Sequence, residues 1–481
     1  MARELKLSRD SWWVKNDDEW QELNLEDAYT DGFVEDVNSC SHRRPFSDYS
    51  NELYLYYFVK NKELENTVGE VSNLSCSWRA RLTDKSLLYS FRKNYGVKVN
   101  SFSVVVFYLQ AVAAFSVSLL LSFFVAALLP FIFLRKSRGR HLFSRSSFKD
   151  KKKVFFIRSK SGYSRVRSFI AECPSCMVLA DNFSELKVPG ESIYSVLWSS
   201  SFLGLYMKTL QYTTRDLWLL FKDARALLGN WMALSVFWAY WKRIPQKALY
   251  EACFEEILRL VPKDSVLFSG EKEDRFAMLQ TRCCAWSGIN LTCLPHGLEY
   301  GFRFPGGLCG STFYCFSEKA RELLESIYSS KKFLYSDSVL NKMLGINENC
   351  RKEVSDRVCF FTEPRDQNIN FEIIDQLIDA GVKLSIKLHP LENQKIYQDR
   401  YPGVDIISDL EDGLSSSFCL SRKSTVLIEA SQRGKQAIAV LVNRKDRFYV
   451  EHLFPSLSSE EIVKVYDFKG LVQALVINND G

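Results

Sequence analysis

Hydrophobic and polar positions alternate in short runs through much of the chain. KVFFIRSK (153–160), SVLFSG (265–270) and NLTCLPHG (290–297) are short apolar runs that lead into a polar, glycine- or proline-bearing turn. Such runs predict buried β-strands. Two longer stretches, 215–243 and 247–261, predict helices. The first is rich in Trp and Phe, and is either a core helix or a helix that lines an acceptor groove or lies at a membrane.

A second series of the same kind begins after residue 355. Strands are expected at 357–364, 383–390, 404–408, 416–425 and 436–442, and helices at 370–382 and 426–434. Strands that alternate with helices predict parallel sheets with crossover helices. We therefore expect an α/β fold with two facing Rossmann-like domains, over 153–350 and 351–481. Ligands of such domains bind at the carboxyl ends of the strands.

One segment departs from this rhythm. Residues 102–134 contain no charged side chain and no glycine. Because about 20 apolar residues cross a bilayer, this run predicts a transmembrane segment. Residues 135–153 follow with nine Lys or Arg against one Asp, which indicates that this end is cytoplasmic. We expect a span with its basic collar over 101–152 in the inner (cytoplasmic) membrane, with the catalytic part facing the cytoplasm.

Two alternatives stay open for the apolar run, namely a buried core helix and a hairpin that dips into the membrane. Residues 1–100 are polar and irregular in pattern, and no role is predicted for this N-terminal region. A length of 481 residues allows two or three domains. The net charge of +6 is modest and concentrated in the collar, so a nucleic-acid partner is not expected.

The cysteines and the short motifs exclude several kinds of chemistry. The thirteen cysteines are scattered, and CPSC (173–176) lacks a second pair, so reduced, packed thiols are expected rather than a zinc site. No GxGxxG, Walker A, HExxH or GxSxG pattern occurs in its required setting. No DxD occurs within 153–481, which argues against a metal-bridged diphosphate donor. We expect neither a metal nor another cofactor.

Polar turns at strand ends carry the candidate chemistry. They contain the candidate catalytic residues Glu271, Asp274 and His296, the candidate acceptor-loop residues Gly297 and Glu299, and the candidate donor-binding residues Lys387, His389, Pro390, Ser421, Ser424, Thr425 and Glu429. Carboxylates and imidazoles serve as general bases. Hydroxyls and amides at a helix N-terminus bind phosphate, and a glutamate one turn inside that helix is placed to reach ribose hydroxyls.

The combination KLHP (387–390), SRKST (421–425), a glutamate-bearing helix and RGKQAIAV (433–440) resembles the C-terminal half of bacterial GT-B glycosyltransferases of surface polysaccharide synthesis. The most similar patterns are those of CMP-sugar-dependent sialyltransferases, polysialyltransferases and Kdo transferases, with an HP motif and a downstream serine motif. The resemblance covers roughly 153–481. It implies a GT-B-like fold, and CDP-glycerol polymerases show a similar layout.

The resemblance also implies roles for the turn residues. His389 would contact the donor phosphate, and Ser424 with Thr425 would hold the nucleotide. In those families an acidic-acidic-glycine motif before HP supplies the base. Here the cluster with Glu271 and Asp274 precedes HP without that glycine, so we favour this cluster. His296 is the rival, because PHG resembles the histidine loop of polyol-phosphate polymerases.

The function implied is that of a membrane-associated, metal-independent, inverting glycosyltransferase of capsule or lipopolysaccharide synthesis. It would move a sialic acid- or Kdo-like sugar from a CMP-activated donor to a glycan or glycolipid acceptor. Two alternatives are a CDP-glycerol-type polyol-phosphate transferase and a non-catalytic, nucleotide-binding scaffold of a polysaccharide export complex.

Overall fold

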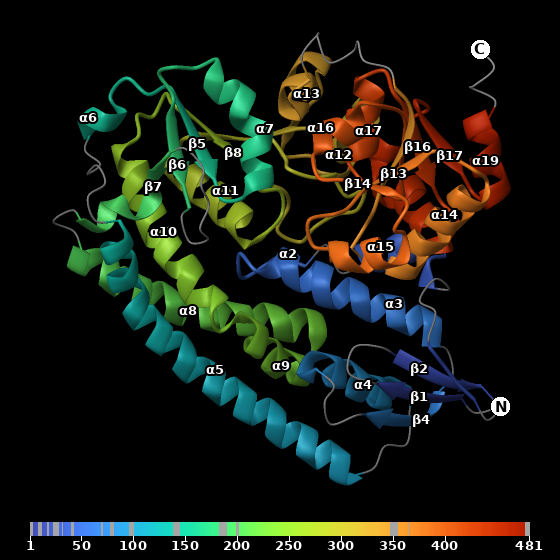
Figure 1. Cartoon of the computed structure of the whole chain (residues 1–481). Coiled ribbons are helices and arrows are strands. Elements are labelled where there is room, and N and C mark those ends of the chain that lie inside the picture. Colours follow the sequence, from blue (N-terminus) through green and yellow to red (C-terminus); the bar gives the residue numbers. More distant parts are fainter. Residues whose placement is uncertain are drawn as a thin grey trace. The chain divides into compact units, whose positions relative to one another are not determined.

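The computed structural model describes most of the chain, namely residues 3–7, 12–16, 19–22, 28–30, 32–39, 43–68, 71–76, 81–95, 101–137, 145–181, 190–198, 202–346, 355–364 and 366–476. The chain forms two compact units (Figure 1). Unit 1 comprises 1–163, 172–293 and 303–312, and unit 2 comprises 164–171, 294–302 and 313–481.

A seven-stranded sheet begins with the first predicted strand. Its strands are β5 (Lys153–Ile157), β6 (Met177–Ala180), β7 (Glu191–Ser192), β8 (Val266–Ser269), β9 (Asn290–Cys293), β10 (Thr312–Tyr314) and β11 (Lys332–Leu334). Their order is β11-β10-β9-β8-β5-β6-β7, and the pairs from β7 to β9 are parallel. The order of β5 to β10 is that of a doubly wound α/β sheet, with its switch point between β5 and β8.

The helices of unit 1 include α7 (Lys160–Ala171, shared with unit 2), α8 (Phe202–Leu228), α9 (Asn230–Tyr240), α10 (Arg243–Leu260) and α11 (Arg275–Ser287). The helix expected over 215–243 is thus two helices, and the first begins earlier than predicted. They are separated by Gly229, whose φ of 82° lies in the left-handed region that favours glycine.

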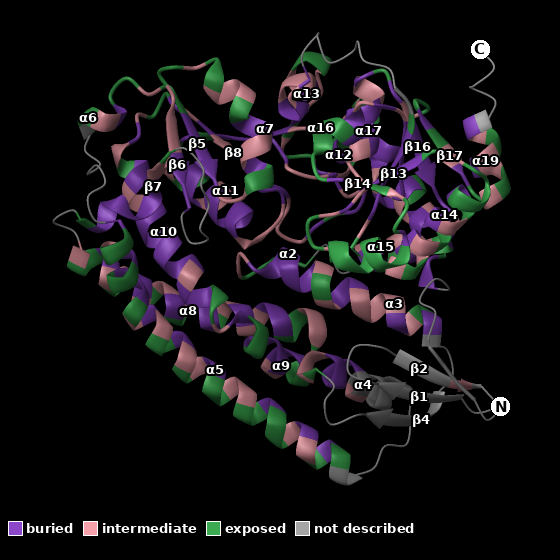
Figure 2. Ribbon diagram, in the orientation of Figure 1, coloured by how far each residue is buried: buried purple, intermediate pink, exposed green. Residues whose placement is uncertain are grey.

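The apolar segment forms one uninterrupted helix, α5 (Ser101–Lys136), long and apolar enough to cross a membrane. One side of it packs on α8, α9 and α10. Along the helix, exposed residues recur beside buried ones (Figure 2). Many of the exposed side chains are large and apolar, among them Leu109, Leu120, Phe124 and Phe131.

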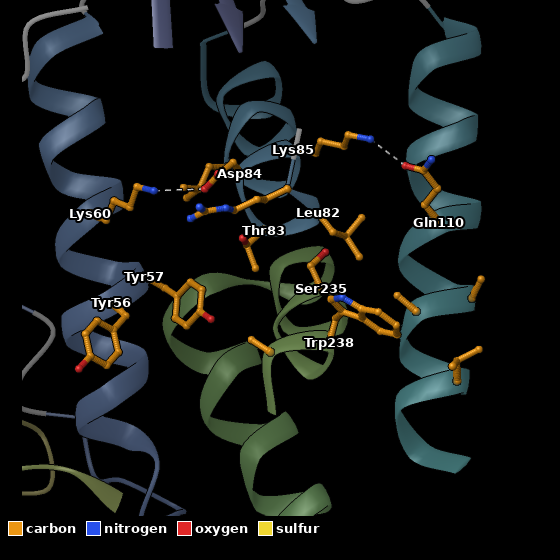
Figure 3. Close-up of a pocket in the computed structure, with 16 residues that line it drawn as sticks. Tyr56, Tyr57, Lys60, Leu82, Thr83, Asp84, Lys85, Gln110, Ser235 and Trp238 are labelled. Atoms are coloured by element: carbon orange, nitrogen blue, oxygen red, sulfur yellow. Dashed lines mark hydrogen bonds and ion pairs between the residues drawn. The ribbon is translucent and has the colours of Figure 1, made fainter. Parts of the chain in front are cut away.

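The N-terminal region is more regular than its sequence pattern indicates. It holds a four-stranded sheet in the order β3-β2-β1-β4 and several helices. The strands are β1 (Arg3–Leu7), β2 (Trp12–Asn16), β3 (Glu19–Glu22) and β4 (Val71–Cys76), and the helices include α2 (Ser50–Leu53), α3 (Val59–Val68) and α4 (Leu82–Tyr95). A cavity of about 920 Å³ lies among the segment 54–68, α4, α5 and α9 (Figure 3).

Unit 2 contains a six-stranded sheet in the order β14-β13-β12-β15-β16-β17, parallel throughout. Its strands are β12 (Ser355–Phe361), β13 (Leu384–Lys387), β14 (Asp405–Ile407), β15 (Ser416–Ser421), β16 (Gln436–Val440) and β17 (Ile462–Val465). This is again the doubly wound order, and its switch point lies between β12 and β15.

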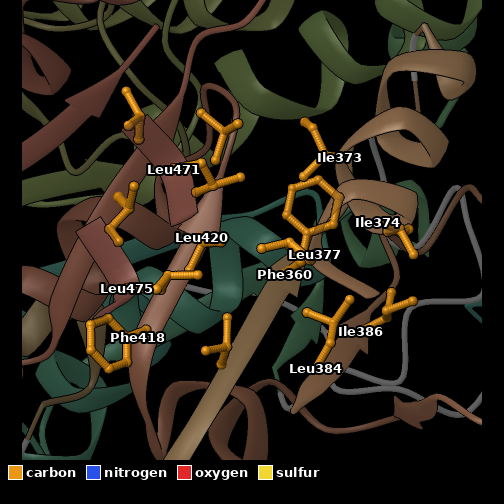
Figure 4. Packing of buried hydrophobic residues seen from close by; sticks show 14 of the residues in the cluster. Phe360, Ile373, Ile374, Leu377, Leu384, Ile386, Phe418, Leu420, Leu471 and Leu475 are labelled. Atoms are coloured by element: carbon orange, nitrogen blue, oxygen red, sulfur yellow. The ribbon is translucent and has the colours of Figure 1, made fainter. Parts of the chain in front are cut away.

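Alternating strand positions bury the core of this sheet against α14 (Gln367–Asp379). Phe360 and Leu420 from the two central strands, and Ile373 and Leu377 from the helix, are fully buried (Figure 4). Burial of a side chain of this size stabilises the fold by about 1.5–3 kcal/mol. The two doubly wound sheets confirm the predicted α/β fold class with two Rossmann-like sheets.

Candidate active site

Unit 1 brings three polar residues together at the carboxyl edge of its sheet. Arg158 follows β5, Asp181 follows β6 and Glu271 follows β8. Strands β6 and β8 pair on either side of β5, and the Asp181 amide donates to the Ile157 carbonyl (2.8 Å). These residues therefore lie around the switch point, where doubly wound sheets bind ligands.

Arg158 organises this cluster. Its Nε donates to Asp181 Oδ2 (2.9 Å), and its Nη1 donates to Asp274 Oδ2 (3.2 Å) and lies 4.0 Å from Glu271 Oε2. The guanidinium also stacks on the Phe276 ring, 3.2 Å from the ring centroid. The guanidinium of Arg158 thus interacts with three carboxylates, and Glu271 is the one farthest from it.

Glu271 has an unusually high pKa for a carboxyl group. Burial, and then the negative charge of Asp274, raise the pKa of Glu271 to about 7, although Arg158 opposes the shift. The physical reason is that a buried carboxylate loses hydration that a shared guanidinium replaces only in part. A carboxyl group with this pKa is suited to accept a proton near neutral pH.

Asp274 has a structural role that its sequence position did not reveal. It is the N-cap of α11, and its Oδ1 accepts from the amides of Phe276 (3.0 Å) and Ala277 (2.8 Å). Its Oδ2 accepts from Arg158. Because its oxygens are committed to these bonds, Asp274 positions Arg158, and Glu271 is the better candidate base.

Unit 2 places two of the predicted turns on either side of β12. Phe361, the last residue of β12, pairs with Lys387 of β13 and with Ser421 of β15. The KLHP and SRKST turns therefore leave the same edge of the sheet. Between them lies Thr362, whose hydroxyl accepts from the His389 amide (3.1 Å).

The backbone around KLHP fixes the imidazole of His389. The Leu391 amide donates to His389 Nδ1 (3.2 Å), so the neutral ring carries its proton on Nε2. The His389 amide donates to Glu392 Oε2 (3.1 Å), which holds the turn closed. His389 is half-buried, whereas Pro390 after it is exposed. Lys387 Nζ donates to the Leu388 carbonyl (3.0 Å) within the same turn.

A buried ion cluster holds the SRKST turn. Arg422 is completely buried, and its Nε donates to Asp446 Oδ2 (2.6 Å). Lys423 also donates to Asp446, and its amide donates to Glu363 Oε1 (2.8 Å). The two cations hold the pKa of Asp446 below its usual value, against the opposing effect of burial. Asp446 therefore stays ionised and anchors the turn.

The predicted donor residues of this turn fall into two groups. Ser421 is buried, and its hydroxyl donates to the Phe361 carbonyl (3.0 Å). Glu429 in α17 (Val426–Gln432) is also buried, and its Oε1 accepts from Arg165 (2.7 Å). Ser424 and Thr425 are half-buried, and Thr425 makes no side-chain capping bond to α17. The hydroxyls of Ser424 and Thr425 are thus better placed than Ser421 and Glu429 to meet a ligand.

The loop 294–302 belongs to unit 2, whereas Glu271 belongs to unit 1. His296 and Gly297 are half-buried in it. Glu299 is buried, and it accepts hydrogen bonds from the Phe316 amide and from the Ser456 hydroxyl (2.8 Å). Glu299 therefore fastens the loop to the body of unit 2.

One further group of potential metal ligands occurs among the described residues, namely Glu251, Glu255 and Cys283 on α10 and α11. Glu251 already accepts from Lys247 (3.0 Å), Arg215 (2.6 Å) and Arg282 (2.9 Å). These cations neutralise the negative charge of Glu251. The three residues are therefore explained as part of a buried network of ion pairs rather than as a metal site. The CPSC cysteines, Cys173 and Cys176, are not joined in a disulfide.

Several residues of both sites were not predicted from the sequence. Arg158 stands directly after a predicted strand, so a search of every strand end would have found it. Asp181 follows β6, a strand that was not predicted. Thr362, Glu392 and Asp446 gain their roles only through tertiary contacts, and no local signal indicates them.

No family model matches the sequence, and no curated protein matches it either. Among solved structures, the chain is similar to the UDP-GlcNAc 2-epimerase from Methanocaldococcus jannaschii (14% identity, TM-score 0.37, covering 67% of this chain and 91% of that one). It is also similar to the E. coli heptosyltransferase WaaC with ADP-2-deoxy-2-fluoro heptose (11% identity, TM-score 0.31, covering 68% and 100%). Likeness at this level carries no inference about activity.

Proposed function

We propose that the protein is an inverting glycosyltransferase that moves a sugar from a CMP-activated donor to a glycan or lipid-linked acceptor at the cytoplasmic face of a membrane. The observation that carries this proposal is Glu271, a buried carboxylate at a sheet switch point with its pKa raised to about 7. A base of this kind is what deprotonation of an acceptor hydroxyl requires.

In this reaction Glu271 takes the proton of the acceptor hydroxyl as its oxygen bonds to the anomeric carbon of the donor. The bond from that carbon to the phosphate oxygen breaks, and CMP leaves with the electron pair. Arg158 and Asp274 position Glu271. Because a single phosphate departs, neutral and cationic donors from the protein are sufficient to stabilise its charge.

The second switch point supports the assignment of donor binding. His389 Nε2 carries the proton when the ring is neutral, because Nδ1 accepts from the Leu391 amide. It would donate to the departing phosphate, together with the hydroxyls of Ser424 and Thr425. The apolar helix α5 supports membrane association.

The test is release of nucleotide by the purified full chain from CMP-sugars, CDP-glycerol and UDP-sugars, each with and without a glycan acceptor. Release of CMP from a CMP-sugar alone supports the proposal. Turnover of CDP-glycerol alone replaces it with polyol-phosphate transfer. Binding of CMP without turnover of any donor would instead support a non-catalytic, nucleotide-binding scaffold.

A further inference from the structure

The cavity bounded by α5 has features of a lipid site. Its volume of about 920 Å³ is at the upper end of the range of small-molecule sites, which is about 300–1,000 Å³. Its walls come from the segment 54–68, α4, α5 and α9, all in unit 1. None of the residues predicted from the sequence as catalytic or donor-binding lines it.

Charge is concentrated on two of the walls. Lys60, Arg81 and Lys85 line the cavity together with a single acid, Asp84, so the lining has an excess of positive charge. Lys60 pairs with Asp84 (3.2 Å), and Lys85 donates to Gln110 of α5 (3.1 Å). Lys85 is only 7% exposed. Figure 3 shows these two pairs on one side of the cavity, and Tyr57, Ser235 and Trp238 on the other.

The walls from α5 and α9 are polar at Gln110 and Ser235 and otherwise mainly apolar, and they continue into the apolar surface of α5. Ala113, Ala114 and Val117 line the cavity. Leu109 and Leu120, on the same helix, are 67% and 72% exposed. A hydrocarbon chain that leaves the cavity would therefore contact apolar side chains rather than water. Such contact is favourable because it removes apolar surface from water.

Aromatic residues at the cavity point to the same kind of occupant. Trp238 and Tyr56 line it, yet they are 50% and 52% exposed. Amphipathic rings in such positions are typical of the boundary between a membrane and water.

We propose that this cavity binds the acceptor through a single-chain lipid phosphate, with the hydrocarbon chain along α5 and the phosphate at Lys85 and Arg81. This rests on the proposed glycosyltransferase function, and it names the acceptor as lipid-linked. The positive lining matches a phosphate, and the small residues of α5 leave room for the chain.

The test is equilibrium binding of radiolabelled undecaprenyl phosphate to the full chain in detergent, without nucleotide. Ala114→Trp fills the cavity and should raise the Kd by at least about tenfold, and Lys85→Gln should raise it by a similar factor. The matched control is Ile378→Trp, which adds the same ring to an exposed position of α14 in unit 2, outside both the cavity lining and the apolar surface of α5, and should change the Kd by less than about twofold. The thermal unfolding midpoints of the variants verify that they are folded.

Two competitors test the chemistry of the site. Undecaprenol, which lacks the phosphate, should compete at least about tenfold more weakly than the phosphate form. Phosphatidylglycerol should also compete weakly. Equal competition by either lipid overturns the proposal, as does unchanged binding by folded Ala114→Trp and Lys85→Gln. Glu271→Gln should bind the lipid like the wild type, so failure of the catalytic proposal is distinguishable from failure of this one.

Discussion

The two switch points share a strand order but differ in their charge. In unit 1 one guanidinium, that of Arg158, serves Asp181, Asp274 and Glu271, so negative charge is in excess and one carboxyl has a raised pKa. In unit 2 both Arg422 and Lys423 bond directly to Asp446, which stays ionised, although Asp366 and Glu363 also lie 3.6 and 3.5 Å from these cations. The same sheet edge can therefore either create a base or stabilise a turn, according to how directly its cations contact each acid.

The largest effect is expected from removing the excess acid of unit 1. Glu271→Gln should lower kcat by about 10²–10⁴, because no base remains, and it should leave the Kd for the CMP-sugar unchanged. Steady-state kinetics and donor binding measure the two quantities. Glu273→Gln, the same change in the same turn, is the control and should retain kcat. Loss of turnover in His296→Ala, with full activity in Glu271→Gln, would transfer the role of base to His296.

A smaller loss is expected in unit 2. His389→Ala should lower kcat for nucleotide release by about 10²–10³, because one donor to the departing phosphate is lost. The comparison variant is His452→Ala, which removes an exposed imidazole of the same unit. Circular dichroism should show both variants folded. Activity near that of the wild type in His389→Ala would refute the donor-site assignment.

The ion cluster of unit 2 is tested through stability. Asp446→Asn should lower the free energy of unfolding by about 3–5 kcal/mol, because buried Arg422 loses the carboxylate that it contacts at 2.6 Å and keeps only the more distant Asp366 (3.6 Å). Denaturant titration gives this value. Asp375→Asn removes the partner of Arg400 in an exposed pair, in which both side chains are at least 40% accessible. It should cost at most about 1 kcal/mol. Equal costs would mean that the Asp446 cluster does not stabilise the turn.

The smallest effect concerns the stability of unit 1. The pKa of Glu271 rises from 4.5 to about 7 on folding, so the folded state binds the extra proton between these pH values. The stability that the folded state gains from binding this proton is fully present below pH 4.5, and it is lost as the pH rises through 7. Glu271→Gln removes this loss and should be more stable than the wild type by about 1–3 kcal/mol at pH 8, but not at pH 4. A difference independent of pH would contradict the raised pKa.

The sequence predicted β5, β8 and β9 of the seven-stranded sheet and β12 to β16 of the six-stranded sheet, because short apolar runs that end in polar residues are a local signal, but it missed β6, β7, β10, β11 and β17. It thereby identified Glu271, His389, Ser424 and Thr425 at the carboxyl edges. It did not separate Glu271 from Asp274. Their difference depends on the capping bonds of α11 and on the shared Arg158, which only the folded chain brings together.

The limits of local patterns are also visible outside the two sites. The strands of residues 1–100 were missed, and the break at Gly229 divided a predicted helix in two. For α5 the composition predicted the helix but not its packing on α8, α9 and α10. Contacts between segments distant in sequence decide these features.

The most direct test of the central claim is the pH dependence of kcat/KM for CMP release, measured from about pH 5 to 9. If Glu271 is the base, the wild-type rate rises with pH and levels off above an apparent pKa of about 7. The residual rate of Glu271→Gln should then show no such rise. A rise with the same apparent pKa in Glu271→Gln would show that another group takes the proton.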